Sequence, residues 1–218
     1  MNRRGVILGT CALPWLAAQS LAETPVSAPD LPHYPLGPLP SDFEVRWRTA
    51  QGEPGNWQVI EDPTASQGKA IAQLSADPTD YRFPLAVWQK LVARDLEVNA
   101  RFKAVAGTVD RAGGLAVRLL DADNYYVARA NALEDNVNLY RVVHGRRQRI
   151  AGAAIRVSSG AWHTLGLRAE GGRLTVRFDG KDVVSATDPT FAGAGKVALW
   201  TKADSVTRFE RLEIRPLE

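Results

Sequence analysis

Cysteine is almost absent from this chain of 218 residues, which has one, Cys11. A single cysteine forms no internal disulfide and provides no cysteine cluster for a structural metal. The three histidines, at positions 33, 144 and 163, are far apart in the sequence, which argues against a zinc site. No Gly-x-Ser-x-Gly or phosphate-loop motif occurs. Stability must therefore come from a hydrophobic core, for which about 180 residues suffice.

Long apolar runs are absent too, apart from a leader at the N-terminus. Arg3 and Arg4 precede the apolar stretch 5–21, which is too short to span a bilayer with flanks to spare. Small residues occupy the two positions that a signal peptidase reads, so we expect cleavage before Glu23. The arginine pair is compatible with either Sec or twin-arginine export. These features predict a periplasmic or secreted protein whose mature chain has no membrane span.

An excess of one charge sign is also lacking. The chain has 27 Lys and Arg residues against 24 Asp and Glu. Residues 1–22 carry two of the basic residues and no acidic one, so 25 basic and 24 acidic side chains remain after cleavage. A nucleic-acid-binding protein would show a strong positive field, so the composition argues against that class of partner.

The rest of the chain divides at residue 41. Residues 23–41 hold six prolines, which remove amide donors and predict an extended linker or an arm laid over the domain. Residues 42–218 read as many short alternating runs separated by turn residues, such as Asp179-Gly180, a strong hairpin signal. The one helical candidate is a short turn at 86–93. The pattern predicts an all-β, two-sheet sandwich or jelly roll.

Polar residues on neighbouring predicted strands point to a binding surface. Along 125–131, Arg129 and Asn131 share one face of the strand with Tyr125. Buried polar groups on a sheet are costly unless the face is wet or binds something polar. The next strand continues the polar stripe with three residues that share a face, namely Asn136, Asn138 and Tyr140. We therefore expect a polar groove on this face.

Three further residues are expected at or near the groove. Trp200 and Lys202 alternate with the core-like Leu199, and an indole face suits the C–H face of a sugar ring. The alternative is that Trp200 packs inside the sandwich. Arg118 is also placed near the groove, unless its stem covers apolar surface. Trp162 is expected to start a strand in the core.

Several segments together carry a resemblance to a known group of proteins. They are Gly113–Leu115, Asp123–Tyr126, Arg129–Asn136, Tyr140, Trp162–Leu165, Phe178–Lys181 and Gly195–Ser205. These segments resemble bacterial concanavalin A-like jelly-roll proteins described as similar to 3-keto-disaccharide hydrolases or to glycoside hydrolase family 16. The resemblance covers roughly residues 42–215 and implies two curved antiparallel sheets with a carbohydrate ligand. It leaves catalysis open, because this fold hosts enzymes and pure binders alike.

The acidic residues do not form the motif of a retaining family 16 enzyme. Such enzymes place two carboxylates on one strand as Glu-x-Asp-x-x-Glu, and no Glu here has an Asp two residues later. Glu210 and Glu213, three apart on one strand, are expected on opposite faces. Glu134 and Asp135 remain as candidate acid or base, with a solvated hairpin as the alternative.

Other charged groups have simpler interpretations. Asp121 and Asp123 are expected to shape a turn with Asn124, although calcium at these residues or at Asp204 is an alternative. The basic run 146–149 is interpreted as a solvated hairpin tip. No other cofactor is indicated.

The leading hypothesis is an exported carbohydrate-binding β-sandwich without established catalysis. The predicted substrate-binding residues are Arg118, Arg129, Asn131, Asn136, Tyr140, Trp200 and Lys202. One alternative is a glycoside hydrolase or lyase that acts on a keto-disaccharide or an oligosaccharide. Another is a structural protein of the cell envelope. The sequence does not set the oligomeric state.

Overall fold

The computed structural model describes residues 26–47 and 52–217, and strands dominate this part of the chain. The elements in chain order are η1 (Leu31–His33), β1 (Gly37–Pro38), β2 (Phe43–Arg46), β3 (Trp57–Glu61), β4 (Lys69–Gln73), β5 (Leu85–Ala93), β6 (Leu96–Ala106), β7 (Ala112–Asp121), β8 (Asn124–Asn131), β9 (Asn136–Val143), β10 (Arg146–Ala154), β11 (His163–Glu170), β12 (Arg173–Phe178), β13 (Lys181–Thr187), β14 (Gly195–Trp200) and β15 (Val206–Pro216). Within the described residues, no helix has the length and apolar character needed to cross a bilayer.

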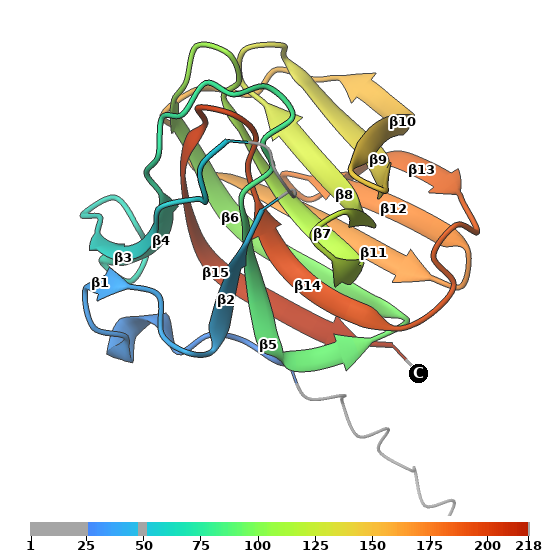
Figure 1. Cartoon of the computed structure of the whole chain (residues 1–218), viewed down its shortest axis with the longest axis horizontal. Coiled ribbons are helices and arrows are strands. Elements are labelled where there is room, and N and C mark those ends of the chain that lie inside the picture. Colours follow the sequence, from blue (N-terminus) through green and yellow to red (C-terminus); the bar gives the residue numbers. More distant parts are fainter. Residues whose placement is uncertain (1–25, 48–51, 218) are drawn as a thin grey trace, which may run out of the picture.

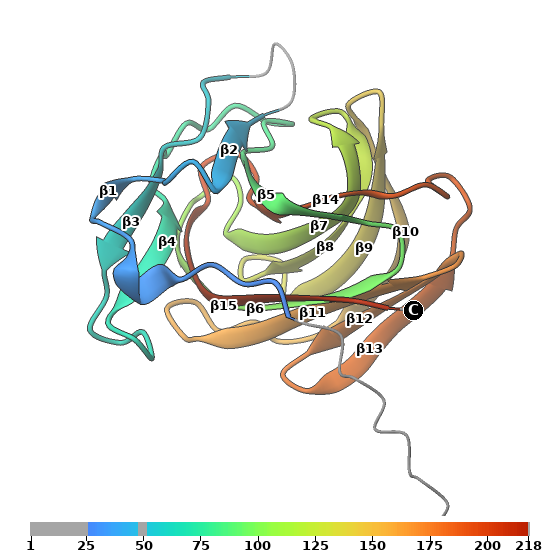
Figure 2. The same cartoon turned by 90° about the horizontal axis from the view of Figure 1, so that it is seen from below.

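The strands form two antiparallel sheets that stack as curved layers (Figure 2). Among the described residues, sheet A has eight strands in the order β1-β3-β4-β15-β6-β11-β12-β13, and sheet B has seven in the order β10-β9-β8-β7-β14-β5-β2. Figure 1 looks onto sheet B. The predicted hairpin at Asp179-Gly180 joins β12 to β13. The prediction of an all-β jelly-roll sandwich is confirmed.

The hydrophobic core lies between the two sheets. In sheet B, the inward side chains of β8 are Tyr126, Ala128 and Ala130, all fully buried. Val98 and Phe102 of β6 face them from sheet A. Because the strand period is two, Arg129 and Asn131 lie on the outer face of sheet B, as the sequence predicts. Burial of each large apolar side chain contributes about 1.5–3 kcal/mol, which lets the fold do without disulfides.

The prediction of a helical turn at residues 86–93 is wrong, because this segment forms β5. Ala86 and Trp88 point into the core between the sheets, whereas Leu85 and Val87 belong to a second apolar group on the outer face of sheet B. A continuous apolar run is therefore explained by burial on both faces of a central strand rather than by a helix.

The prediction that Trp162 begins a strand in the core is also wrong. Trp162 precedes β11 and lies half-buried on the outer face of sheet A. The Arg101 guanidinium and the Lys103 ammonium lie 5.3 and 4.8 Å from its ring centroid. Its Nε1 donates a hydrogen bond to Thr64 Oγ1 at 3.0 Å.

Glu210 and Glu213 share a face, contrary to the expectation from their spacing. A β-bulge interrupts β15 between them, and Arg211 within it has a φ of 51°. Glu210 pairs with Arg101 and Glu213 with Asn99, two residues apart on β6. The extra residue of the bulge therefore cancels the change of face that a regular strand would give.

The described part of the proline-rich segment lies against the sandwich. Ser27 exchanges two backbone hydrogen bonds with Ile214 of β15, at 2.8 and 2.9 Å. The indole Nε1 of Trp88 donates to Ser27 Oγ at 2.9 Å. Leu31 of η1 is buried, and β1 pairs with β3. We call residues 26–40 the N-terminal arm.

Candidate functional site

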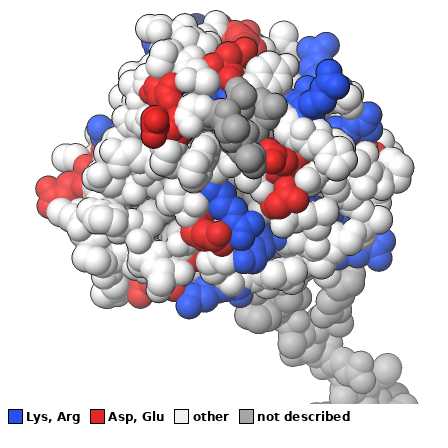
Figure 3. All heavy atoms as spheres, viewed as in Figure 1, with Lys and Arg blue, Asp and Glu red and all other residues white. Residues whose placement is uncertain are grey.

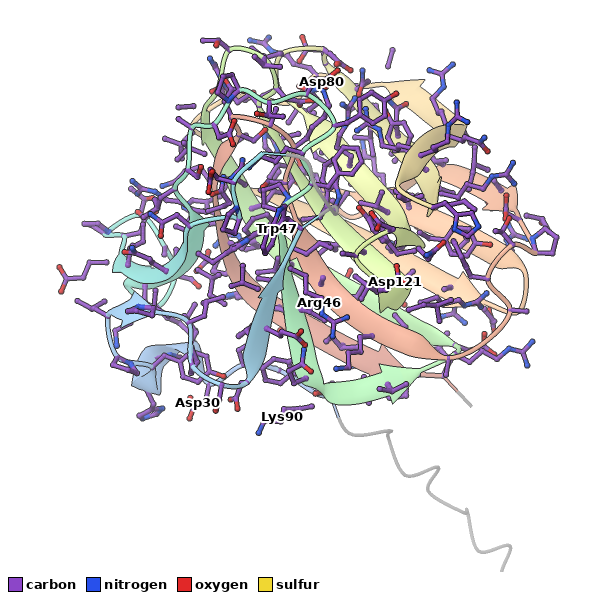
Figure 4. The ribbon with its side chains drawn as sticks, viewed as in Figure 1. Asp30, Arg46, Trp47, Asp80, Lys90 and Asp121 are labelled. Atoms are coloured by element: carbon purple, nitrogen blue, oxygen red, sulfur yellow. The ribbon has the colours of Figure 1, made fainter. Side chains whose placement is uncertain are left out.

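One end of the outer face of sheet B gathers most of the polar residues predicted from the sequence. Arg129 of β8 pairs in register with Asn138 of β9, and Asn131 pairs with Asn136. Figure 4 shows Asp80 near this end of the sheet and Asp121 toward the other end. We call the group the Arg129 cluster, and its members are Asp80, Asp110, Arg129, Asn131, Glu134, Asn136 and Lys202.

The centre of the Arg129 cluster is a buried carboxylate that faces two cations. Asp110 Oδ2 lies 3.4 Å from Arg129 Nη1 and 3.2 Å from Lys202 Nζ. Its Oδ1 accepts a hydrogen bond from Asn131 Nδ2 at 2.8 Å. Burial raises the pKa of Asp110, and the two cations offset part of this rise. The charges are tolerated here because each has a partner.

Glu134 stands at the exposed rim of the cluster, with its side chain 49% exposed. Its Oε2 accepts hydrogen bonds from Arg129 Nη2 at 2.6 Å and from Asn136 Nδ2 at 2.9 Å. Burial raises the pKa of Glu134, but the Asn136 bond and the Arg129 charge outweigh it and hold the pKa below its usual value. Oε1 accepts no hydrogen bond from the described residues, so an ionised acceptor faces outward.

Asp80 forms a second exposed carboxylate beside the buried centre. Lys202 Nζ lies 2.8 Å from Asp80 Oδ1, and the Asp80 side chain is 62% exposed. The hydrogen bond from Lys202 holds the pKa of Asp80 below its ordinary value. Lys202 thus links a rim carboxylate to the buried Asp110. The rim therefore presents two ionised carboxylates, each anchored by a cation beneath it.

Tyr140 adds a fixed aromatic ring next to the cluster. The guanidinium carbons of Arg129 and Arg147 lie 5.4 and 4.5 Å from its ring centroid. Asn138 Nδ2 donates to the Tyr140 hydroxyl at 3.0 Å. On β10, a Cβ at Gly152 would lie 1.7 Å from Asn138 Oδ1, so glycine alone leaves room for this amide.

Sequence reasoning missed Arg147, because it assigned residues 146–149 to a solvated hairpin tip. The structure places Arg147 in β10, paired with Val142, and its guanidinium carbon lies 5.4 and 5.9 Å from the ring centroids of Phe83 and Trp200. Its Nη1 is buried and has no hydrogen-bond partner among the described residues. Counting the strand alternation from the turn would have placed this side chain on the outer face.

Trp200 lies on the predicted outer face of sheet B, but it is fully buried, so its ring is not open to a ligand in the predicted groove. Its Nε1 donates to the Tyr125 hydroxyl at 3.1 Å, and its ring centroid lies 5.4 Å from that of Phe83. The segment before β5 brings Phe83 over the indole. Tyr81, from the same segment, is 41% exposed, and its ring centroid lies 5.7 Å from that of Phe83.

The structure does not bring Arg118 to the Arg129 cluster. A register shift interrupts β7 after Val117, and Arg118 has a φ of 48°. Its guanidinium donates to the carbonyl oxygens of Arg94, Phe191 and Gly171 at 2.9, 2.7 and 2.5 Å, and to Asp95 Oδ1 at 3.0 Å. Arg118 therefore ties loops together and does not line the predicted groove.

Two other acidic predictions concern turns. Asp135 Oδ1 accepts a hydrogen bond from the backbone N–H of Val157 at 2.9 Å. This carboxylate therefore stabilises a loop and does not join Glu134 in the Arg129 cluster. Asp121 Oδ1 accepts the backbone N–H of Asp123 at 2.7 Å and the Asn124 amide at 2.9 Å, which confirms the predicted turn.

Asp204 is the other residue considered for calcium, and backbone N–H groups already donate hydrogen bonds to its carboxylate. Its carboxylate accepts the successive N–H groups of residues 108–110 at 2.6 to 3.1 Å. Burial raises the pKa of Asp204, but these bonds outweigh it and lower the pKa. Within residues 26–47 and 52–217, no group of three or more His, Cys, Asp or Glu residues is placed to hold a metal ion.

The charge distribution over this face is mixed. Figure 3 shows acidic and basic side chains scattered among uncharged ones on the face turned to the viewer, without a broad patch of one sign. Such a face lacks the concentrated positive field with which proteins hold nucleic-acid phosphates.

The fold is shared with solved carbohydrate-binding domains. The carbohydrate-binding module CBM66 from Bacillus subtilis superposes with a TM-score of 0.59 and 23% identity, over 74% of this chain and 91% of that one. Domain 4 of AbnA, an extracellular GH43 arabinanase from Geobacillus stearothermophilus solved with arabinotriose, gives 0.54 and 14%, over 80% and 82%. The exoplasmic/lumenal domain of VIP36, in its Ca2+/Man-bound form, gives 0.51 and 14%, over 81% and 83%.

These similarities extend to the fold and not to a sequence family. No protein-family model matches the chain, and no curated protein matches its sequence. At identities of 23% and below, the likeness establishes a common architecture. The chain therefore has the two-sheet β-sandwich fold that these solved domains share.

Proposed function

We propose that this protein is an exported carbohydrate-binding protein and that the Arg129 cluster holds the sugar. The observation that carries this proposal is the pair of rim carboxylates, Glu134 and Asp80, each fixed from below by a buried cation. Ionised carboxylates accept strong hydrogen bonds from hydroxyl groups. Because partners in the protein already hold both groups, little side-chain entropy is lost when a ligand binds.

Two further features support a sugar over other polar ligands. The ring of Tyr81 is exposed near the rim and offers an apolar surface to the C–H face of a sugar. The fold neighbours include a module and a domain named for carbohydrate binding or solved with arabinotriose. Export remains part of the proposal and rests on the leader at residues 1–22.

Of the two candidate catalytic residues for the enzymatic alternative, Glu134 and Asp135, only Glu134 remains. Asp135 is engaged with backbone, and the pKa of Glu134 lies below its usual value, which suits a hydrogen-bond acceptor or a base better than an acid. A hydrolase or lyase of the 3-keto-disaccharide hydrolase-like group would therefore depend on Glu134 as its base. Release of reducing sugar from oligosaccharides by the wild type, abolished in Glu134→Gln, would establish this alternative.

The variant Glu134→Gln tests the binding proposal. We expect roughly 10- to 100-fold weaker binding to the best ligand of a glycan array, because a charge-assisted hydrogen bond is lost. The melting temperature should change little, since the side chain is half exposed. Calorimetric titration measures the first quantity and thermal unfolding the second.

Glu61→Gln is the matched control for this experiment. Glu61 ends β3 in sheet A and is exposed, and its side chain makes no hydrogen bond or ion pair with the described residues. Its substitution removes the same charge from the molecule but leaves the Arg129 cluster intact. Equal affinities for the two variants would contradict the proposed site.

A further inference from the structure

A second hollow lies on the outer face of sheet A, on the far side of the sandwich from the Arg129 cluster. Two adjoining depressions of about 290 and 140 Å³ share Glu97 and Asn99 of β6. The larger extends over β11 and β12 to Asp182 of β13, and the smaller extends over β15 to Val26 of the N-terminal arm. Neighbouring strands lie about 4.8 Å apart, so the hollow is roughly 19 Å long. This length accommodates a short oligosaccharide.

The strand register explains why the hollow crosses the sheet. Glu213, Asn99, Gly166, Arg177 and Asp182 pair successively across β15, β6, β11, β12 and β13. They form one transverse row on the outward side, because the residues flanking Gly166 are buried in the core. We call the hollow along this row the sheet A groove.

Gly166 forms the floor of the sheet A groove. A Cβ at this position would lie 2.4 Å from Asn99 Oδ1 and 3.3 Å from Arg177 Cβ. Any other residue would therefore push these two side chains apart and fill the space between them. The absence of a side chain in the middle of a five-strand row keeps the floor low.

Ion pairs hold the walls of the groove and leave some polar groups available. Arg177 donates through Nε to Asp182 Oδ1 at 2.8 Å and through Nη1 to Glu97 Oε1 at 3.2 Å. The side chains of Glu213 and Arg215 make no hydrogen bond or ion pair with the described residues, although both residues line the groove. The groove thus combines fixed walls with an available acceptor and an available donor.

The balance of charge indicates the ligand class. The lining contains three carboxylates and three guanidinium groups, contributed by Glu97, Asp182, Glu213, Arg168, Arg177 and Arg215. A lining without net charge favours neither a polyanion nor a polycation. Closely spaced acceptors and donors match hydroxyl groups, which both donate and accept.

An aromatic ring lies farther along the same face. Arg101 and Lys103 follow Asn99 on β6 at intervals of two residues, and both support the half-buried Trp162. Trp162 does not line the groove; it lies over Lys103, four residues along β6 from Asn99. Its indole offers an apolar surface to a sugar ring that extends beyond the groove in this direction.

We propose that the sheet A groove is a second carbohydrate-binding site, for a neutral oligosaccharide. One molecule would then hold two glycan segments on opposite faces, which raises its avidity for a polymer without a new contact. This inference does not depend on the Arg129 cluster, because the two sites share no residue.

Backbone-amide NMR of the full protein tests the second site. The probes are neutral hexaoses of glucose, mannose and fructose, with a hexagalacturonate as the charged comparison. We expect a neutral hexaose to produce saturable shifts at residues 97–99, 166 and 175–177. Gly166→Ala should weaken the affinity reported by these amides at least roughly 10-fold, a loss near 1.4 kcal/mol. Shifts near Glu134 should be unchanged in this variant.

Two further variants separate binding from folding. Gly172→Ala is the matched control, because its Cβ would meet only Thr187 Cγ2, at an ordinary 3.4 Å. Arg215→Gln removes an exposed, unpaired cation and leaves the fold intact. The affinity reported by the same amides should fall about threefold or more.

The outcomes distinguish this inference from the proposed function. Absence of shifts on sheet A with every neutral hexaose, shifts there with hexagalacturonate alone, or equal affinities in Gly166→Ala and Gly172→Ala would each overturn the second site. Shifts on sheet A without any near Glu134 would instead overturn the role of the Arg129 cluster and support the second site.

Discussion

Arg118 and Arg129 lie on neighbouring strands of sheet B, and both are almost completely buried, yet their partners differ. Arg118 donates mainly to backbone carbonyls of three loops. Arg129 pairs with the side chains of Asp110 and Glu134, of which the second reaches the surface. An arginine bonded to carbonyls stabilises the course of the chain, whereas one bonded to a rim carboxylate orients a group that a ligand can touch.

The largest effect is expected from Arg118→Ala. The substitution removes the side-chain donor of three carbonyls and one of the two donors to Asp95 Oδ1, which keeps the backbone N–H of Gly171. We expect the free energy of unfolding to fall by about 3–5 kcal/mol, as measured by urea denaturation. Affinity per folded molecule should stay at the wild-type value. A loss below about 1 kcal/mol would remove the distinction between the two arginines.

Compared with Arg118→Ala, the variant Arg129→Ala should lose less unfolding free energy and more glycan affinity. Asp110 keeps Lys202 and Asn131 as partners, so we expect a loss of about 2–4 kcal/mol in unfolding free energy. Glu134 and Asn136 lose their shared donor, and glycan affinity should fall by roughly 100-fold or more.

Arg129→Lys sharpens this test, because lysine keeps the charge but loses the planar fork. Its stability should recover more than its affinity, as seen by combining thermal unfolding with calorimetric titration. Parallel recovery of both quantities would mean that Arg129 acts through its charge alone.

The smallest effect concerns pH and the segment that covers Trp200. Hydrogen bonds from Thr79 and from the Glu53 backbone lower the pKa of Asp77 from 3.8 to about 2. The ionised carboxylate therefore stabilises the folded state above about pH 4, and this contribution, about 1 kcal/mol after solvent screening, is lost as the pH falls toward 2.

Tryptophan fluorescence can follow this change, because Phe83 of the same segment covers Trp200. We expect the emission to shift between pH 4 and 2, the ordinary and lowered pKa values, before global unfolding. Asp77→Asn should lack this step and be less stable at neutral pH. An identical acid profile in the variant would assign the change to other carboxylates.

Local alternation was sufficient to predict the sheet face of Arg129, Asn131 and Tyr140, because a period of two needs no knowledge of the rest of the chain. It failed at Arg118 and at the Glu210–Glu213 pair, since a bulge adds a residue that the pattern does not reveal. Asp110 and Asp80 lie in loops, where no periodicity indicates which sheet they join.

The burial of Trp200 could not be predicted from the sequence, for a different reason. Alternation places the indole on the correct face, but its burial depends on Phe83, more than a hundred positions earlier in the chain. Contacts of such separation follow from the packed fold and not from a local pattern. Arg147 shows the intermediate case, because its face follows from strand parity once the turn is located.

The bulge in β15 lies beside a cavity, and this arrangement indicates what removal of the N-terminal arm would do to the protein. Beyond the bulge, this cavity of about 260 Å³ opens beside Ile71 and Leu212, and Ala28, Pro29 and Leu31 of the N-terminal arm line its other side. Removal of residues 1–31 would take away one wall of this cavity. It would also remove Ser27, the backbone hydrogen-bond partner of Ile214. The part of β15 around Ile214 would then be an unpaired strand edge, and we expect the shortened protein to self-associate more readily than the full chain.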